Sequence, residues 1–235
     1  APSDLLFVYD RATGIEDAPA LRSKGAKLAE NALKHFTKDQ GKSLFSDNAP
    51  ELVKAAESLG WIHATSTPHR PEGNSLTERR IGVAVQGTRC NLVQSGLPHM
   101  YWPFALRHSC FARNVTARDD EPAPYDKLHG EPYAGHVIPF GALVNFRKTP
   151  IARRKGGKFD SPTAQGLFLC PHVDPGYQLR GDVLIVAVED LLGDNRHGNK
   201  IPIYRLKQKE VIPVEPFRFP MQMKESEEQL DRLAR

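Results

Sequence analysis

The chain has 235 residues, 40% of them hydrophobic and 26% charged, which is typical of a globular protein with a buried core. Its longest apolar runs, residues 5–9 and 183–188, fall far short of the ~20 residues that span a bilayer, and no signal peptide is visible at the start. We therefore expect no membrane partner, whereas the net charge of +4 weakly indicates an anionic one. Three widely spaced cysteines predict reduced thiols in an intracellular protein.

Short strands alternate with amphipathic helices in the first half of the chain. The residue pattern predicts strands at 5–9, 41–46 and 61–66, and helices at 21–37, 49–59, 75 to the low nineties, and 99–114. A loop rich in Pro, Gly and Asn is expected at 67–74, and the Gly-Leu-Pro sequence at 96–98 should end the long helix. This order of elements predicts a mixed α/β layer structure.

The pattern changes after the polar, Pro-rich segment 117–126. Short strands separated by Gly, Pro and Asp turns are predicted at 136–146, 166–170 and 182–191, and they indicate a small β-barrel. Residues 201–206 and 209–219 contain prolines, so any strands there are expected at the edges of the sheet. The predicted domains are 1–118, 119–205 and a C-terminal tail at 206–235.

Two carboxylates stand at positions that suit metal ligation. Asp47 closes a predicted strand, and Glu78 lies in the first turn of the predicted long helix. A strand-end Asp and a helix-borne Glu can share a divalent cation if the helix packs over the strand tip, since Mg²⁺ prefers oxygen ligands. A site with two metal ions for phosphoryl transfer usually needs a third carboxylate as well.

Helix capping is the alternative interpretation of the same residues. Asn48 with Glu51, and Ser75 with Glu78, both fit the capping-box spacing at a helix start. Capping is the simpler interpretation on spacing alone, and a capping carboxylate can also face a metal. His63 is expected to be an ordinary strand residue rather than a ligand.

Several motifs together resemble the core of retroviral and copia-type retrotransposon integrases. The resemblance to the core rests on "SDNAPE", "LGW", "STP", "RPEGN" and "TER" between residues 46 and 79. "GLPHMYWPFALRHSCFARN" resembles the copia-type helix after the core, and "YDKLHGEP", "IPFGALVNF" and "KFDSPTAQGLFL" resemble the small β-domain that follows it. The resemblance covers about residues 5–190.

This resemblance implies an RNase H-like mixed sheet with flanking helices, its first strand missing, followed by a small SH3-like β-barrel. The implied activity is 3′-end processing and transfer of element DNA into target DNA with two Mg²⁺ or Mn²⁺ ions. Asp47 falls on the family's second catalytic Asp and Glu78 on its catalytic Glu, both as metal ligands. The first catalytic Asp would lie upstream of Ala1, because Asp10 matches a turn position; the chain is therefore expected to be inactive by itself.

The resemblance also implies DNA as partner, a homo-oligomer, and a nuclear or cytoplasmic-particle location. Basic residues gather between 147 and 158 without an acidic residue. Such a block is usually a solvated loop, but the lack of acidic residues makes nucleic-acid contact an equally open alternative. The candidate nucleic-acid-binding residues are His69, Arg70, Arg79, Arg80, Arg153, Arg154, Lys155 and Lys158. Two alternatives stay open: a non-catalytic DNA-binding or assembly module derived from a transposon, and a structural α/β protein whose capping boxes mimic the motif.

Overall fold

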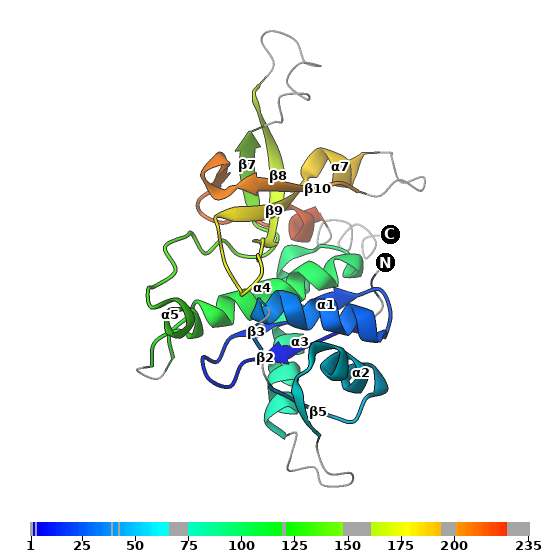
Figure 1. Ribbon diagram of the computed structural model, residues 1–235. Coiled ribbons are helices and arrows are strands. Elements are labelled where there is room, and N and C mark those ends of the chain that lie inside the picture. The colour runs from blue at the N-terminus through cyan, green and yellow to red at the C-terminus, as the bar shows by residue number, and fades with distance from the viewer. Residues whose placement is uncertain are drawn as a thin grey trace. The chain divides into compact units, whose positions relative to one another are not determined.

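The structure is a computed structural model that describes residues 2, 4–38, 40–41, 43–65, 75–118, 121–147, 161–193 and 201–224 (Figure 1). The chain forms two compact units, each assembled from separate stretches. Unit 1 comprises Ala1–Thr88, Ser109–Tyr133 and Val173–Leu179, and unit 2 comprises Arg89–His108, Ala134–His172 and Arg180–Arg235. This division differs from the predicted boundary at 118/119. Within the described residues, every helix is too short or too polar to serve as a membrane span.

Unit 1 begins with an antiparallel hairpin. β1 (Asp4–Leu5) pairs with β4 (Ala20–Leu21), and β2 (Val8–Tyr9) pairs with β3 (Glu16–Asp17). Asp10 closes the turn, since its carboxylate accepts hydrogen bonds from the Ala12 amide (3.1 Å) and the Thr13 hydroxyl (2.6 Å). Asp10 is thus a turn residue, as predicted. The hairpin's second arm ends at Leu21, the residue at which the following helix was expected to begin.

A parallel strand pair and two helices complete the α/β part of unit 1. α1 (Ala26–Thr37) packs on α2 (Pro50–Leu59), with Ala29, Leu33 and Ala55 at the contact. β5 (Ser43–Ser46) and β6 (Ile62–Thr65) are parallel, and α2 connects them. The predicted order of strand, helix and strand is therefore confirmed, with α1 five residues shorter at its start than the expected 21–37.

Three further helices follow, two of them long. α3 (Ser75–Ser95) ends before Gly96, whose φ of 64° stops the helix as predicted, and α4 (Trp102–Asn114) follows a short 3₁₀ turn, η2 (His99–Tyr101). Gly87 has a packing role in α3, because a Cβ there would lie 2.2 Å from the Ser109 hydroxyl. α5 (Pro124–His129) lies beyond the predicted boundary yet stays in unit 1, where its Tyr125 ring packs against Tyr133.

Unit 2 contains a five-stranded antiparallel sheet. β7 (Leu143–Arg147), β8 (Thr163–Pro171), β9 (Asp182–Ala187) and β10 (Ile203–Lys207) form a meander, with α7 (Val188–Leu192) after β9. A 3₁₀ turn, η3 (Gln208–Glu210), leads to β11 (Val211–Pro213), which returns to pair with β7, so the order is β10-β9-β8-β7-β11. The two Pro-containing segments therefore supply the edge strands, as predicted. The sheet continues to Pro213, past the expected start of the tail at 206.

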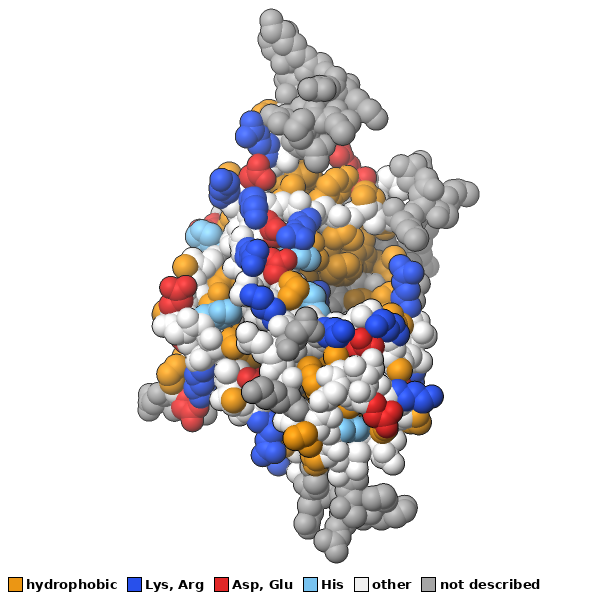
Figure 2. Space-filling view, in the orientation of Figure 1, with side chains coloured by type: hydrophobic (Ala, Val, Ile, Leu, Met, Phe, Trp, Pro, Cys, Tyr) orange, Lys and Arg blue, Asp and Glu red, His pale blue; other side chains and the backbone are white. Residues whose placement is uncertain are grey.

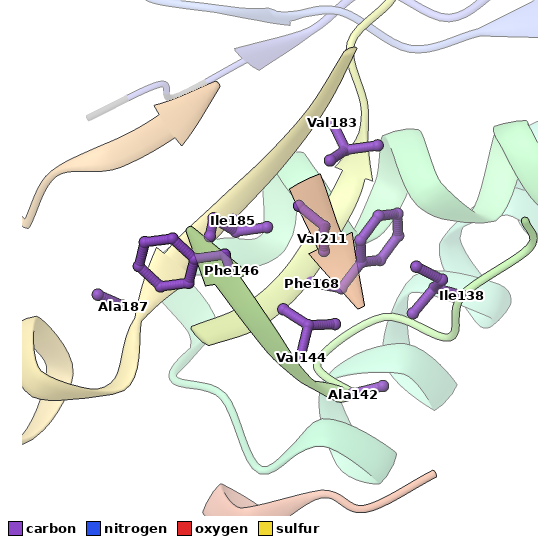
Figure 3. Close-up of a cluster of buried hydrophobic side chains, with 9 residues drawn as sticks. All are labelled: Ile138, Ala142, Val144, Phe146, Phe168, Val183, Ile185, Ala187 and Val211. Atoms are coloured by element: carbon purple, nitrogen blue, oxygen red, sulfur yellow. The ribbon is translucent and has the colours of Figure 1, made fainter. Parts of the chain in front are cut away.

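Both faces of this sheet are covered by apolar side chains. One face carries the cluster in Figure 3, which consists of Ile138, Ala142, Val144, Phe146, Phe168, Val183, Ile185, Ala187 and Val211. Alternate residues of β8 and β9, including Leu167, Leu169 and Val186, point to the opposite face and pack with Leu92 and Tyr101. Residues 89–108 thus belong to unit 2 because they cover its second sheet face.

Candidate functional site

Asp47 lies directly after β5, at the carboxyl end of the strand. Its side chain is exposed and makes no hydrogen bond or ion pair with any residue that the structure describes. Its backbone carbonyl accepts a hydrogen bond from the Ser46 hydroxyl at 2.7 Å. The backbone at Asp47 is therefore anchored, while its side chain is exposed.

A cavity of about 1170 Å³ in unit 1 has Asp47 on its wall. The cavity is lined by every residue from Asp4 to Arg11 and by every residue of β5. Consecutive strand residues point to opposite faces, so a cavity that touches all of them runs along the strand edges. Among the described residues, β2 pairs only with β3 and β5 only with β6, so both cavity-facing edges lack a ladder partner.

Glu78 lies in the first turn of α3, directly after three residues that line this cavity, but it does not line the cavity itself. Ser75, Leu76 and Thr77 line the cavity, whereas the exposed Glu78 carboxylate is not among the lining residues and pairs with no described residue. The described residues contain no group of three or more His, Cys, Asp or Glu side chains that could hold a metal ion. Asp47 and Glu78 alone therefore do not form a site for two ions, and their metal ligation stays a prediction.

The predicted capping box at Asn48 and Glu51 is wrong. The N-cap of α2 is Ala49, in an extended conformation (φ −67°, ψ 127°), and it makes no side-chain capping bond. Pro50 at the first helical position explains this, because proline disfavours the helical conformation in the residue before it and fixes the helix start there. Ser75 is the first helical residue of α3, and the residue before it lies outside the described part of the chain.

A buried ion network joins the hairpin, α3 and α4 in unit 1. The carboxylate of Glu16 is 1% exposed and pairs with Arg113 (Nε–Oε1 2.6 Å) and Arg80 (Nη1–Oε2 3.3 Å). Burial raises the pKa of Glu16, and the two guanidinium groups oppose this shift. The Asn114 amide donates to the Glu16 carbonyl (2.7 Å) and its oxygen accepts the Glu16 N–H (3.1 Å).

This network gives Arg80 a structural role that the sequence did not suggest. Its guanidinium stacks over the Tyr9 ring at 3.9 Å while it pairs with Glu16. These contacts account for Arg80 without DNA, and its nucleic-acid contact stays a prediction, as does that of the exposed Arg79 beside it. Sequence reasoning missed Glu16 and Arg113; the only local signal was a charged pair, residues 16–17, between apolar neighbours.

The other basic candidates lie outside the described residues: His69, Arg70, Arg153, Arg154, Lys155 and Lys158. Over β9 and β10, Figure 2 shows Lys and Arg side chains interspersed with acidic ones. Arg205 and Lys207 of β10 both pair with Asp182. These contacts hold the pKa of the Asp182 carboxyl below its usual range, and the hydrogen bond from Lys207 has the larger effect. This part of the sheet surface is thus partly neutralised.

Comparison with known proteins connects the chain to mobile elements. No family model matches it. The retrovirus-related Pol polyprotein from transposon RE2 of Arabidopsis thaliana is 28% identical over 147 residues, which are 57% of this chain and 10% of the polyprotein. The corresponding polyprotein from transposon RE1 of the same plant is 33% identical over 93 residues, 37% of this chain and 6% of the polyprotein. The chain thus spans about a tenth or less of these relatives.

Two solved structures are similar to the chain at low sequence identity. One is a chain of the simian T-cell lymphotropic virus intasome in complex with PP2A regulatory subunit B56 gamma, with TM-score 0.45 and 17% identity over 91% of this chain and 77% of that one. The other is the catalytic core domain of BIV integrase, with TM-score 0.39 and 15% identity over 52% of this chain and 89% of that one.

The chain thus combines an α/β unit with an antiparallel β-sheet unit, and part of its sequence is similar to mobile-element polyproteins. More particularly, the chain is similar in sequence to the retrovirus-related Pol polyproteins of plant transposons, and the resemblance to polyproteins of this kind is confirmed.

Proposed function

We propose that this chain is part of a copia-type retrotransposon integrase, a polynucleotidyl transferase that inserts element DNA into target DNA. The observation that carries the proposal is the position of Asp47. Its carboxylate pairs with no residue that the structure describes and stands at the end of a parallel strand, on the wall of a cavity that the first turn of α3 also lines. The homology to Pol polyproteins over 147 residues supports the same assignment.

The cavity supports an RNase H-like sheet with one strand to be added. An extended segment between β2 and β5 would pair with both unpaired edges and join the hairpin and the parallel pair into one mixed sheet. In unit 2, the meander, the 3₁₀ turn before the last strand and the return of β11 to β7 support an SH3-like barrel.

Metal chemistry requires more ligands than the described residues provide. In the proposed class of enzyme, two divalent ions clamp the attacking and leaving oxygens of a phosphodiester. Asp47 and Glu78 supply two carboxylates, so a third from the added strand is needed and the chain by itself is inactive. The substrates are element ends and target DNA, handled by a homo-oligomer in the nucleus or a cytoplasmic particle.

A strand-transfer assay with Mn²⁺ tests this proposal on two forms of the protein, residues 1–235 and the same chain extended upstream through its natural reading frame. We expect activity only in the extended form. Asp47→Asn should lower it by about 10³-fold or more, since the loss of one member of a catalytic group removes most of the rate enhancement.

The matched control is Glu57→Gln, which changes another exposed carboxylate, on α2. It should leave the rate unchanged. Robust transfer by residues 1–235 would contradict the inactivity, and full activity of the extended Asp47→Asn variant would contradict the site.

A non-catalytic DNA-binding module is the second candidate. It is favoured by the basic residues between 147 and 158, a segment without an acidic residue. We expect replacement of Arg153, Arg154 and Lys155 by Ala to weaken DNA binding and to reduce the slope of log K against log salt by about 3, one for each lost phosphate contact.

Fluorescence anisotropy with a duplex at several salt concentrations measures this slope. Alanine at the exposed Lys24, Lys54 and Lys224 removes the same charge elsewhere and serves as the control. Equal slopes for the two triple variants would show that net charge, and not the 153–155 segment, governs binding.

A further inference from the structure

Two side chains beside Asp47 form a short hydrogen-bonded relay. Ser46 ends β5, and its hydroxyl lies 2.9 Å from Nε2 of His63 on β6 and 2.7 Å from the carbonyl oxygen of Asp47. The parallel register pairs Leu44 with His63 and Ser46 with Thr65, so Ser46 and His63 are diagonal neighbours on one face of the strand pair. The sequence suggested no role for either residue.

The acceptor chemistry fixes the direction of the relay. A carbonyl oxygen only accepts, so the single hydroxyl proton of Ser46 goes to the Asp47 carbonyl. The hydroxyl oxygen must then accept from His63, which places a proton on Nε2 of the imidazole. An activated serine nucleophile would need the opposite arrangement, with the imidazole nitrogen accepting the hydroxyl proton. The pair is therefore arranged to hold the backbone and not to attack a substrate.

The relay ends on the peptide group that carries the candidate ligand. Since the Asp47 carboxylate makes no hydrogen bond or ion pair with a described residue, its position depends on the backbone that bears it. On the other side, Pro50 and the extended Ala49 fix where α2 begins. The segment between Ser46 and Pro50 is thus held at both ends, by the relay and by the helix start.

We infer that His63 and Ser46 are positioning residues for Asp47, acting from His63 Nε2–H to the Ser46 hydroxyl and from that hydroxyl to the Asp47 carbonyl. The functional value of this positioning rests on the proposed function, whereas the relay itself does not. A carboxylate that must meet a metal or a phosphodiester is effective only when it is held within a fraction of an ångström of its working position.

NMR on residues 1–235 tests the relay without requiring activity. The imidazole nitrogen shifts of His63 should show the proton on Nε2. The backbone N–H of Asn48, next to the anchored carbonyl, should have an order parameter near the rigid value of about 0.85. Ser46→Ala and His63→Leu should each lower it to below about 0.6.

His63→Gln should keep the Asn48 order parameter near the rigid value, because the glutamine side-chain amide can donate a hydrogen bond to the Ser46 hydroxyl over a similar distance. Ser43→Ala, at the other end of β5, is the control and should change nothing. A proton on Nδ1 alone in the unmodified chain, or an unchanged Asn48 order parameter in both Ser46→Ala and His63→Leu, would overturn the inference.

Mn²⁺-induced line broadening at Asp47 in the same samples separates this inference from the proposed function. Broadening in the unmodified chain that weakens in Ser46→Ala and returns in His63→Gln supports both. No broadening together with the expected order parameters counts against metal ligation by Asp47 in this chain and leaves the relay established.

Discussion

Replacing Glu16 by Gln is expected to lower the free energy of unfolding by about 3–5 kcal/mol, the usual cost of removing one partner from a buried ion pair. The carboxylate is 1% exposed, and the side chains of Arg80 and Arg113 are 26% and 16% exposed. A neutral amide at residue 16 would leave two guanidinium groups in this environment without an anion. Urea unfolding followed by circular dichroism measures the change.

Two further variants identify the cause of this loss. Glu121→Gln removes an ion pair with Lys127 in which the carboxylate is 72% exposed, and it should leave the unfolding midpoint unchanged. Combining Glu16→Leu with Arg80→Met and Arg113→Met should recover much of the stability, since apolar side chains of similar volume often replace buried ion pairs without cost. A Glu16→Gln variant as stable as the unmodified chain would contradict this account of the network.

The local elements were predictable because their signals are local. Gly96 ends α3 through its positive φ, and the prolines near residues 202 and 213 confine their strands to the sheet edges. The strand before Asp47 and the parallel strand after α2 follow from apolar runs and turn residues on either side. Asp47 could therefore be placed correctly at a strand end from sequence alone.

Contacts between distant residues could not be predicted in this way. Glu16 is separated from its partners Arg80 and Arg113 by 64 and 97 positions in the sequence, so no short sequence pattern predicts the network. The prediction of the helix cap was wrong for a different reason. Asn48 and Glu51 have the spacing of a capping box, but Pro50 places the N-cap at Ala49. Residues 173–179 belong to unit 1, where Val173 and Tyr177 pack with Ile15, and no local pattern predicts a contact between residues so far apart in the chain.

The interior of unit 2 contains a histidine that should make the protein sensitive to mild acid. His108 is 5% exposed, its ring centroid lies 6.0 Å from those of both Phe140 and Phe168, and Nε2 is 2.9 Å from the Ile138 carbonyl oxygen. The carbonyl only accepts, so Nε2 carries a proton in the neutral ring. Burial lowers the pKa of His108 from 6.5 to about 4, against the smaller, opposing effect of this hydrogen bond.

The sign of the pH dependence follows from this shift. Above pH 6.5 His108 is neutral in both the folded and the unfolded chain and has no effect on the difference between them. Between pH 6.5 and about 4 only the unfolded chain takes up the proton, so the free energy of unfolding should fall by up to about 3 kcal/mol. Below about pH 4 the folded chain is protonated as well and this contribution levels off.

A difference measurement between variants isolates His108 from other titrating groups. Lys27 and Lys34 lower the pKa of Glu30 from 4.5 to about 2, so its contribution is lost only below pH 4.5. Burial raises the pKa of Glu16, so its contribution has the opposite sign: it is present at low pH and is lost as the pH rises through the folded value. Both contributions are common to the unmodified chain and to a His108 variant, and they cancel in the comparison.

We therefore expect His108→Gln, whose amide can still donate to Ile138, to reduce the fall in unfolding free energy between pH 6.5 and 4 by most of those 3 kcal/mol. Urea unfolding at closely spaced pH values measures the two curves. His99→Gln, at an exposed position of the same unit, should keep the full pH dependence. Parallel curves for the unmodified chain and His108→Gln would show that the acid sensitivity arises elsewhere, whereas convergence toward low pH would assign it to this one buried imidazole.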